Sequence, residues 1–192
     1  MIAARLKEKT KQAHLSLEKK MVGYIKKVES PEDYEKLLRL FYGYYAPLEP
    51  LLNKYISNNI VPSYSDRRKS SAILKDINTI SAGANNFKKC DNLPQVNDVV
   101  QALGVLYVME GSTMGGTIIA KMLNKQADIQ PASLTFFNGY GEQNMPMWQS
   151  FIKAVNERAA NDEEKIVKAA NDTFSKMEEW CDKFYEDPVI KA

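Results

Sequence analysis

The chain has 192 residues, of which 44% are hydrophobic and 26% are charged, and its formal net charge is +2. This composition is typical of one globular domain spanning residues 1–192, and so small a net charge gives no reason to expect a nucleic-acid partner. Cys90 and Cys181 lack the C-x-x-C spacing of a redox or zinc site, so we expect both to be reduced. The N-terminal segment lacks the apolar core of a signal peptide, and no run reaches about 18 uninterrupted apolar residues. We therefore expect a soluble, cytoplasmic protein without a membrane span.

Helical periodicity dominates the first half of the chain. An apolar stripe predicts a helix over residues 2–22, which carries His14, the only histidine. Ser30 and Pro31 are typical of a helix start, and the pattern that follows runs to about residue 56. Because a proline removes a backbone donor, Pro47 and Pro50 should kink or break this second helix. A third helix is expected over residues 66–80.

A run of three basic residues lies near the start of that third helix. The charges of the chain are otherwise interspersed, and such short basic runs usually lie on the solvated face of a helix. We therefore expect Arg67, Arg68 and Lys69 to face solvent, with a docking patch for an acidic protein as the alternative reading.

The second half contains a helix with an unusual glycine content. It begins near Pro94 and extends to Leu123, and about 1 kcal/mol is lost for each glycine relative to alanine in a helix interior. Something must therefore come close to this backbone. A long irregular passage follows, and two further helices over residues 147–158 and 163–185 complete an all-α, single-domain multi-helix bundle. The glycines concerned are Gly104, Gly111, Gly115 and Gly116.

The motif inventory excludes several kinds of site. One histidine cannot build the usual structural zinc site or a di-iron site with paired Glu-x-x-His motifs. Phosphate-loop, dinucleotide-binding and nucleophile-elbow motifs are absent from the sequence. What remains is His14 and a face of glycines on a second helix, and a flat apolar ligand such as haem could use both. In isolation, however, such a histidine is more often simply packed or exposed, and G-x-x-x-G more often marks close helix packing.

The segment LKEKTKQAHLSLEKK resembles the proximal helix of the haem oxygenase family, particularly its bacterial, biliverdin-producing branch. In that family a histidine is the axial ligand of the haem iron, and a glutamate four residues later hydrogen-bonds the other ring nitrogen. The resemblance assigns these roles to His14 and Glu18. It also assigns Lys7 to a haem propionate, although an ordinary solvated lysine explains this residue equally well.

The segment ALGVLYVMEGSTMGGTIIAKML resembles the family's distal helix, which bends at its glycines and passes over the haem. The resemblance assigns this role to Gly111 and Gly115. Mammalian members carry an aspartate, which anchors a water network, at the position of Ser112. A serine hydroxyl can hold water but carries no charge, so the proton relay is open; backbone carbonyls, ordered water and Tyr45, in YGYYAPLEP, are the candidates.

A third, weaker block is LTFFNGYGEQNMPMWQSFIKAVNE together with the helix that follows it. It resembles the C-terminal part of the family and assigns Lys153 to the propionates and Phe174 to the pocket wall. The resemblance implies that the chain cleaves b-type haem, its cofactor and substrate, to biliverdin, carbon monoxide and ferrous iron with O2.

The same resemblance implies an external partner, because the chain has no flavin or nicotinamide motif. Electrons would come from a ferredoxin or a flavin reductase, and biliverdin could pass to a phytochrome. Two other readings stay open. One is a haem carrier or sensor without turnover, and the other is a different enzyme on the same fold, such as a thiamin-degrading protein that uses a cysteine nucleophile.

Overall fold

The computed structural model describes residues 2–81, 87–127 and 129–186, and within these ranges every regular element is helical, which confirms the all-α prediction. Short 3₁₀ turns at Tyr64–Asp66, Pro131–Ser133 and Gly141–Gln143 connect the longer helices. Two of these turns and α5 lie in the passage after the glycine-rich helix that the sequence left irregular. The helices are α1 (Ile2–Ile25), α2 (Pro31–Asn53), α3 (Ser70–Ile80), α4 (Val99–Gln126), α5 (Thr135–Asn138), α6 (Asn144–Arg158) and α7 (Glu163–Glu186).

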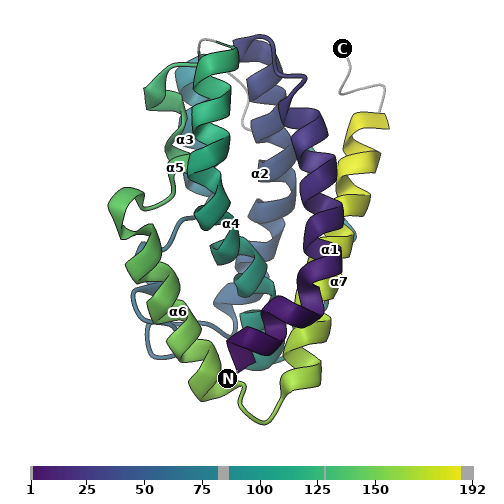
Figure 1. The fold of residues 1–192 in the computed structure, drawn as a ribbon, viewed down its shortest axis with the longest axis vertical. Coiled ribbons are helices and arrows are strands. Elements are labelled where there is room, and N and C mark those ends of the chain that lie inside the picture. Colours follow the sequence, from purple (N-terminus) through teal and green to yellow (C-terminus); the bar gives the residue numbers. More distant parts are fainter. Residues whose placement is uncertain (1, 82–86, 128, 187–192) are drawn as a thin grey trace.

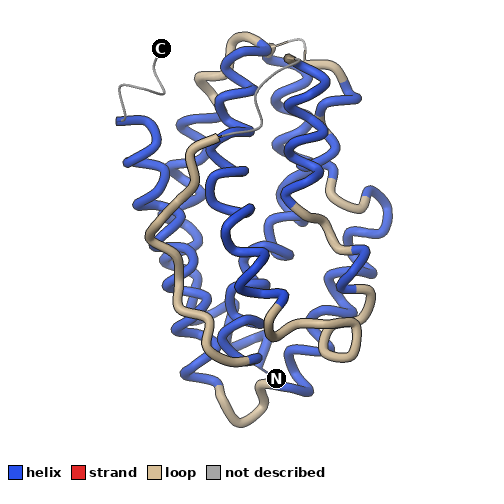
Figure 2. Tube along the Cα trace, turned by 180° about the vertical axis from the view of Figure 1, so that it is seen from behind, coloured by secondary structure: helices blue, strands red, loops and turns tan. Residues whose placement is uncertain are grey.

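The glycine-rich helix α4 lies in the middle of the bundle. It packs against α2, α5, α6 and α7, whereas α1 packs mainly along α7. Figure 1 shows α1 and α7 side by side, with α4 and α2 beside them, and α6 near the N-terminal end of α1. Figure 2 shows the same helices from behind, with the long loop before α4 crossing this face. The fold thus places the histidine helix α1 and the glycine helix α4 in one bundle.

Pro47 and Pro50 were expected to kink or break the second helix; a break is wrong, because α2 is continuous from Pro31 to Asn53. Pro47 cannot donate to the carbonyl of Gly43 four residues earlier. The backbone N–H of Cys90 donates to that carbonyl instead, at 2.8 Å. Gly43 also allows the close approach of this loop, since a side chain there would lie 2.7 Å from the Lys88 carbonyl. The helix therefore tolerates Pro47 because another segment replaces the missing hydrogen bond.

The four glycines of α4 divide into two pairs. A Cβ atom on Gly104 would lie 2.7 Å from the Ile166 carbonyl of α7, and one on Gly116 would overlap the Phe137 carbonyl of α5. A Cβ on Gly111 would make only an ordinary contact with the Trp148 ring at 3.6 Å, and one on Gly115 would meet nothing within 4 Å. Helix packing therefore explains Gly104 and Gly116, but it does not explain Gly111 and Gly115.

This division predicts opposite effects for two adjacent substitutions. Gly116→Ala forces the Phe137 backbone to move, so we expect it to lower the free energy of unfolding by about 1–3 kcal/mol. Gly115→Ala adds a helix-favouring side chain in open space and should raise it by about 0.4–1 kcal/mol. Urea unfolding of both variants measures the difference, and equal destabilisation of the two would contradict the division.

The face of α4 that carries Gly111 and Gly115 is also apolar. Among the described residues, α4 is the one helix whose length and composition alone would allow it to cross a membrane. Core helices also pass this test, and half of the apolar window of α4 is buried. The remaining apolar surface includes Ile118, which is 64% exposed, and half-buried Val108 and Met122. These residues share the helix face of Gly111 and Gly115. An apolar ligand therefore has a wall of suitable chemistry on this face.

Candidate functional site

Helices α1 and α4 are connected near both ends. At one end the side chain of Tyr107 lies close to that of Thr10, which lowers the pKa of Tyr107 against the larger rise caused by burial. At the other end the amide of Gln126 donates to the carbonyls of Lys26 at 2.7 Å and Val28 at 2.8 Å. Residues early in both helices lie together at one end, and residues late in both helices lie together at the other. The two helices therefore run parallel.

The parallel arrangement gives a simple register between the two helices. His14 and Glu18 follow Thr10 at intervals of four residues, and Gly111 and Gly115 follow Tyr107 at the same intervals. Residues four apart lie on one side of a helix. Beyond the Thr10–Tyr107 contact we therefore expect His14 to lie opposite Gly111. The imidazole and the bare backbone would then border the same space between α1 and α4, as the sequence predicted.

His14 is exposed on α1, and an aromatic ring lies beside it. The Phe174 ring of α7 lies 5.4 Å from the imidazole, centroid to centroid, which brings together two of the predicted site residues. Glu18 and Lys7 are exposed one turn after and two turns before His14. No hydrogen bond joins Glu18 to His14 in the part of the chain that the structure describes. The exposed imidazole is therefore not held by Glu18 in this structure.

Ser112 and Tyr45 meet on the other side of α4. The Tyr45 hydroxyl lies 3.1 Å from Ser112 Oγ, which brings together two more of the predicted residues. A third residue, missed in the sequence, joins them: the Arg68 guanidinium donates to Ser112 Oγ at 2.6 Å and to the Met109 carbonyl at 2.8 Å. The guanidinium also lies over the Phe136 ring at 4.2 Å. The Arg68 cation thus contacts α4 at Ser112, the position for which the sequence did not identify the proton relay.

These contacts use the whole hydrogen-bonding capacity of Ser112. Its hydroxyl donates to the Met109 carbonyl at 2.7 Å, so its two lone pairs are left for Arg68 and for the Tyr45 hydroxyl. No acceptor or donor remains for water. The expectation that Ser112 holds a water is therefore not supported by this geometry. Instead, Ser112 links α4 to α2 through Tyr45.

A buried ion pair lies next to this contact. Arg67 bonds the Glu110 carboxylate, and both side chains are almost completely buried. Tyr140 also donates to Glu110 at 2.8 Å, and Arg67 donates to Ser150 Oγ of α6 at 2.9 Å. The pair thus joins the loop before α3 to α4 and α6. It fixes the backbone immediately before Gly111.

The prediction that Arg67, Arg68 and Lys69 form a solvated helix face is wrong. Helix α3 begins at Ser70, so the three residues precede it. Arg67 is buried against Glu110, and the Lys69 ammonium lies 3.6 Å from the centre of the Tyr64 ring. The sequence did contain one signal for this, because Glu110 is a lone acidic residue in a long apolar helix. Such a charge needs a buried cation.

One predicted site residue lies apart from the others. Lys153 is on α6 with its side chain 80% exposed, and its described partner is Glu157 one turn later at 4.0 Å. No described contact connects it to α1. The residue of α6 that does reach the site is Trp148, which lies against Gly111 and 5.5 Å from the Tyr107 ring.

The two cysteines are buried, and burial raises the pKa of both thiols, that of Cys181 to about 12. A thiol without thiolate character is a poor nucleophile. We expect a disulfide reagent to react slowly with the folded protein and to titrate two thiols only after unfolding. The pKa of the Cys181 thiol is about 12 in the folded protein, above its ordinary value of 9.0, so the folded protein holds this proton more tightly than the unfolded chain. The free energy of unfolding should therefore fall as the pH rises from about 9 to about 12. Rapid reaction of both thiols in the native state would contradict this account.

Comparison with known proteins tests the resemblance. The haem oxygenase family model matches residues 1–183. The chain belongs to the haem oxygenase family. It is 24% identical over 127 residues to a haem oxygenase of Xanthomonas campestris, covering 66% of this chain and 74% of the relative. It is 22% identical over 187 residues to the haem oxygenase PigA of Pseudomonas aeruginosa, covering 90% of this chain and 87% of the relative.

Membership of the haem oxygenase family makes haem the ligand to compare with this geometry. The structure offers a haem an accessible imidazole on α1 and, on α4, a face of glycine backbone and apolar side chains. Within the described residues no cluster of three or more His, Cys, Asp and Glu side chains could hold a metal ion. His14 is thus the imidazole that a haem iron can find here, and the residues present fit the group.

Proposed function

We propose that this chain is a catalytic haem oxygenase, which opens haem to biliverdin, carbon monoxide and ferrous iron with O2 and electrons from a partner. The observation that carries the proposal is the shared register of α1 and α4. His14 and Gly111 each lie one turn beyond the Thr10–Tyr107 contact, so we expect the imidazole and the bare helix backbone to border the same space. Family membership supports the choice of ligand.

In this proposal the residues of α1 bind and orient the substrate. His14 supplies the nitrogen ligand, and Glu18, one turn later, is placed to accept a hydrogen bond from the second ring nitrogen. Phe174 packs against the imidazole and limits its rotation. Lys7 lies on the same side of the helix and offers a cation to a propionate. When bound, haem supplies both the redox-active iron and the ring that is cleaved.

The residues of α4 shape the opposite side. Gly111 and Gly115 leave space that a side chain would fill, and Trp148 covers Gly111 from α6. Tyr45 and Arg68 hold Ser112 and therefore fix the turn that begins with Gly111. We propose that Ser112 positions these groups and does not bind water itself. Proton transfer would then depend on the Tyr45 oxygen and on water near the α4 backbone.

The test is conversion of bound haem. Hemin is titrated into the protein, and ascorbate is added as reductant with catalase present to remove free peroxide. The proposal predicts that the Soret band decays and that biliverdin absorbance appears. A protein that binds hemin but leaves it unchanged through repeated additions of reductant is a carrier or sensor. That result would overturn the proposed activity.

The burial of the cysteines bears on the alternative that the chain is a thiamin-degrading enzyme. A thiamin-degrading protein of this fold needs a reactive cysteine, whereas Cys90 is 6% exposed and Cys181 is fully buried. Both thiol pKa values are raised by burial. Neither cysteine has the exposed, electropositive surroundings that activate a thiolate. The oxygenase proposal therefore fits the observed side chains better.

A further inference from the structure

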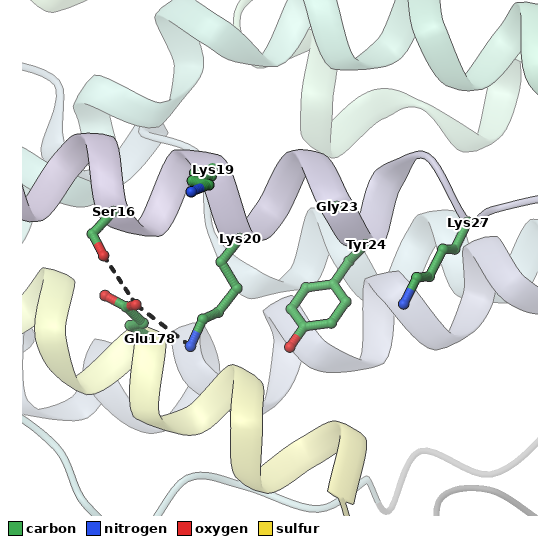
Figure 3. A pocket seen from close by; sticks show the side chains of 7 residues that line it. All are labelled: Ser16, Lys19, Lys20, Gly23, Tyr24, Lys27 and Glu178. Atoms are coloured by element: carbon green, nitrogen blue, oxygen red, sulfur yellow. Dashed lines mark hydrogen bonds and ion pairs between the residues drawn. The ribbon is translucent and has the colours of Figure 1, made fainter.

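Helix α1 has different surroundings on its two sides. Toward α7 there is a hollow of about 370 Å³, which Figure 3 shows crossed by polar contacts. Ser16 donates to the Glu178 carboxylate at 3.0 Å, and Lys20 lies 3.4 Å from the same group. None of the residues assigned to haem is among the described residues that line this hollow. We therefore look toward α4 for the contacts that orient a flat apolar ligand.

Helix α6 borders the space between α1 and α4 at the end where α1 begins (Figure 1). The backbone N–H of Ala3, in the first turn of α1, donates to the Asn156 side chain of α6 at 3.2 Å. On the α4 side, the Trp148 ring lies 3.6 Å from the position that a Cβ atom on Gly111 would take. Because α6 contacts both helices, its side chains limit the space at this end.

Two aromatic rings form the surface that α6 and α4 present there. The ring centroids of Trp148 and Tyr107 are 5.5 Å apart, and Tyr107 lies close to Thr10 of α1. The buried Phe151 ring supports Trp148 at 5.7 Å. Trp148 and Tyr107 are both half-buried, so each leaves part of its ring accessible. We call Trp148 and Tyr107 the aromatic wall.

The aromatic wall covers only one end of the glycine face of α4. Trp148 lies against Gly111, whereas a Cβ atom on Gly115, one turn later, would meet nothing within 4 Å. Ile118, farther along the same face, is 64% exposed. The space is therefore bounded at Gly111 and open at Gly115. A flat ligand that reaches Gly111 meets Trp148 at its edge.

Buried Arg67 holds the aromatic wall in place relative to α4. It bonds the carboxylate of Glu110, the residue before Gly111, and it donates to the carbonyl of Met147, the residue before Trp148, at 3.2 Å. The side chain of Arg67 is 0% exposed. The backbones that carry Gly111 and Trp148 are thus fixed to the same guanidinium. The wall cannot move away from α4 without breaking a buried ion pair, which is costly.

We propose that the aromatic wall sets the in-plane orientation of haem, and hence which bridge carbon of the porphyrin is cleaved, with Trp148 as the residue that contacts the ring edge. This inference rests on the proposed function. An axial ligand holds haem at its centre and leaves it free to turn about the bond to the iron, so the orientation must come from contacts at the edge. The substituents around that edge are unequal, because two propionates, two vinyl groups and four methyl groups surround the ring. A fixed indole admits some of them better than others.

The test removes the indole and compares the variant with a matched control. Trp148→Ala deletes the ring, and Trp148→Phe keeps a smaller one. The control is Met145→Ala, which shortens a 47% exposed apolar side chain on the same helix. Proton NMR of the ferric haem complex with cyanide gives separate haem methyl signals for each orientation and needs no turnover. The biliverdin isomers formed with ascorbate are separated by chromatography.

We expect one dominant set of methyl signals for the wild type. In Trp148→Ala the ratio of the major to the minor orientation should fall by at least about tenfold, and the isomer ratio should follow it, because the contact that discriminates between the orientations is missing. Trp148→Phe should lie between the two, and Met145→Ala should stay within about twofold of the wild type. If Trp148→Ala does not bind hemin, Trp148→Phe carries the comparison. Equal ratios in the Trp148 variants and the control would overturn the proposal.

The two readouts separate this inference from the proposed function. If the wild-type protein leaves hemin unchanged with ascorbate, the proposed activity fails, and the methyl signals still show whether Trp148 orients the bound haem. If ascorbate turnover is normal and Trp148→Ala gives the wild-type methyl signals and the wild-type isomer ratio, only the role of the aromatic wall is refuted.

Discussion

Replacing His14 with alanine is expected to abolish haem turnover while leaving the fold intact. The imidazole is exposed, and its described neighbour is the Phe174 ring, so little packing is lost. Without the nitrogen ligand, haem affinity should fall by at least about tenfold and turnover by at least about 100-fold. Absorption spectra of hemin bound to the variant, compared with the wild type, measure the change in iron ligation.

The control for this variant is Gln12→Ala, which truncates an exposed side chain on the same helix. Helix content and melting temperature of both variants should match those of the wild type. Added imidazole should restore part of the His14→Ala spectrum, because it can occupy the space of the missing side chain. If His14→Ala binds hemin with an unchanged spectrum, the assignment of the axial ligand is wrong.

Replacing Arg67 with methionine should cause the largest loss of stability. The substitution leaves the Glu110 carboxylate buried without its cation, since the side chain of Arg67 is 0% exposed and that of Glu110 is 3% exposed. Removing one partner of such a pair costs about 3–5 kcal/mol. For a chain of this size the melting temperature should fall by roughly 6–20 °C. Calorimetry or thermal melting by circular dichroism measures the loss.

The double variant Arg67→Met/Glu110→Met tests the mechanism, because it removes both charges together. We expect it to recover much of the lost stability, since apolar replacement of a whole buried pair is often close to neutral. Arg158→Met is the matched control: this arginine is exposed, and within the described residues it donates to the Asn59 carbonyl. Its effect should stay within about 0.5 kcal/mol. A double variant less stable than Arg67→Met would mean that the ion pair is not the source of the loss.

The same residues show how far the sequence alone could predict the fold. Ser30 with Pro31 marks the start of α2, and the Ser30 side chain accepts from the Asp33 N–H at 3.1 Å, as local helix-start rules require. The continuity of α2 through Pro47 could not be predicted, because it depends on the Cys90 N–H, which is distant in the sequence. Local patterns therefore predicted the helices, and long-range hydrogen bonds decided where they continue.

The site shows the same limit. Periodicity and resemblance identified His14, Gly111, Ser112 and Tyr45, and the structure places Tyr45 beside Ser112. Arg68 was missed because a guanidinium in a loop has no periodic signal, and its partner Ser112 lies 44 positions later. Lys153 was assigned from the weakest of the three blocks, and its exposed position on α6 gives it no described contact with the site helices. Polar networks between distant segments thus need coordinates.

The most direct test of the central claim is product analysis of one reaction. The haem complex is reduced in air with catalase present, carbon monoxide is trapped by ferrous myoglobin, and the pigment is extracted and identified by chromatography. The account predicts carbon monoxide and biliverdin in equal amounts from the wild-type chain. Recovery of intact haem without carbon monoxide would contradict it.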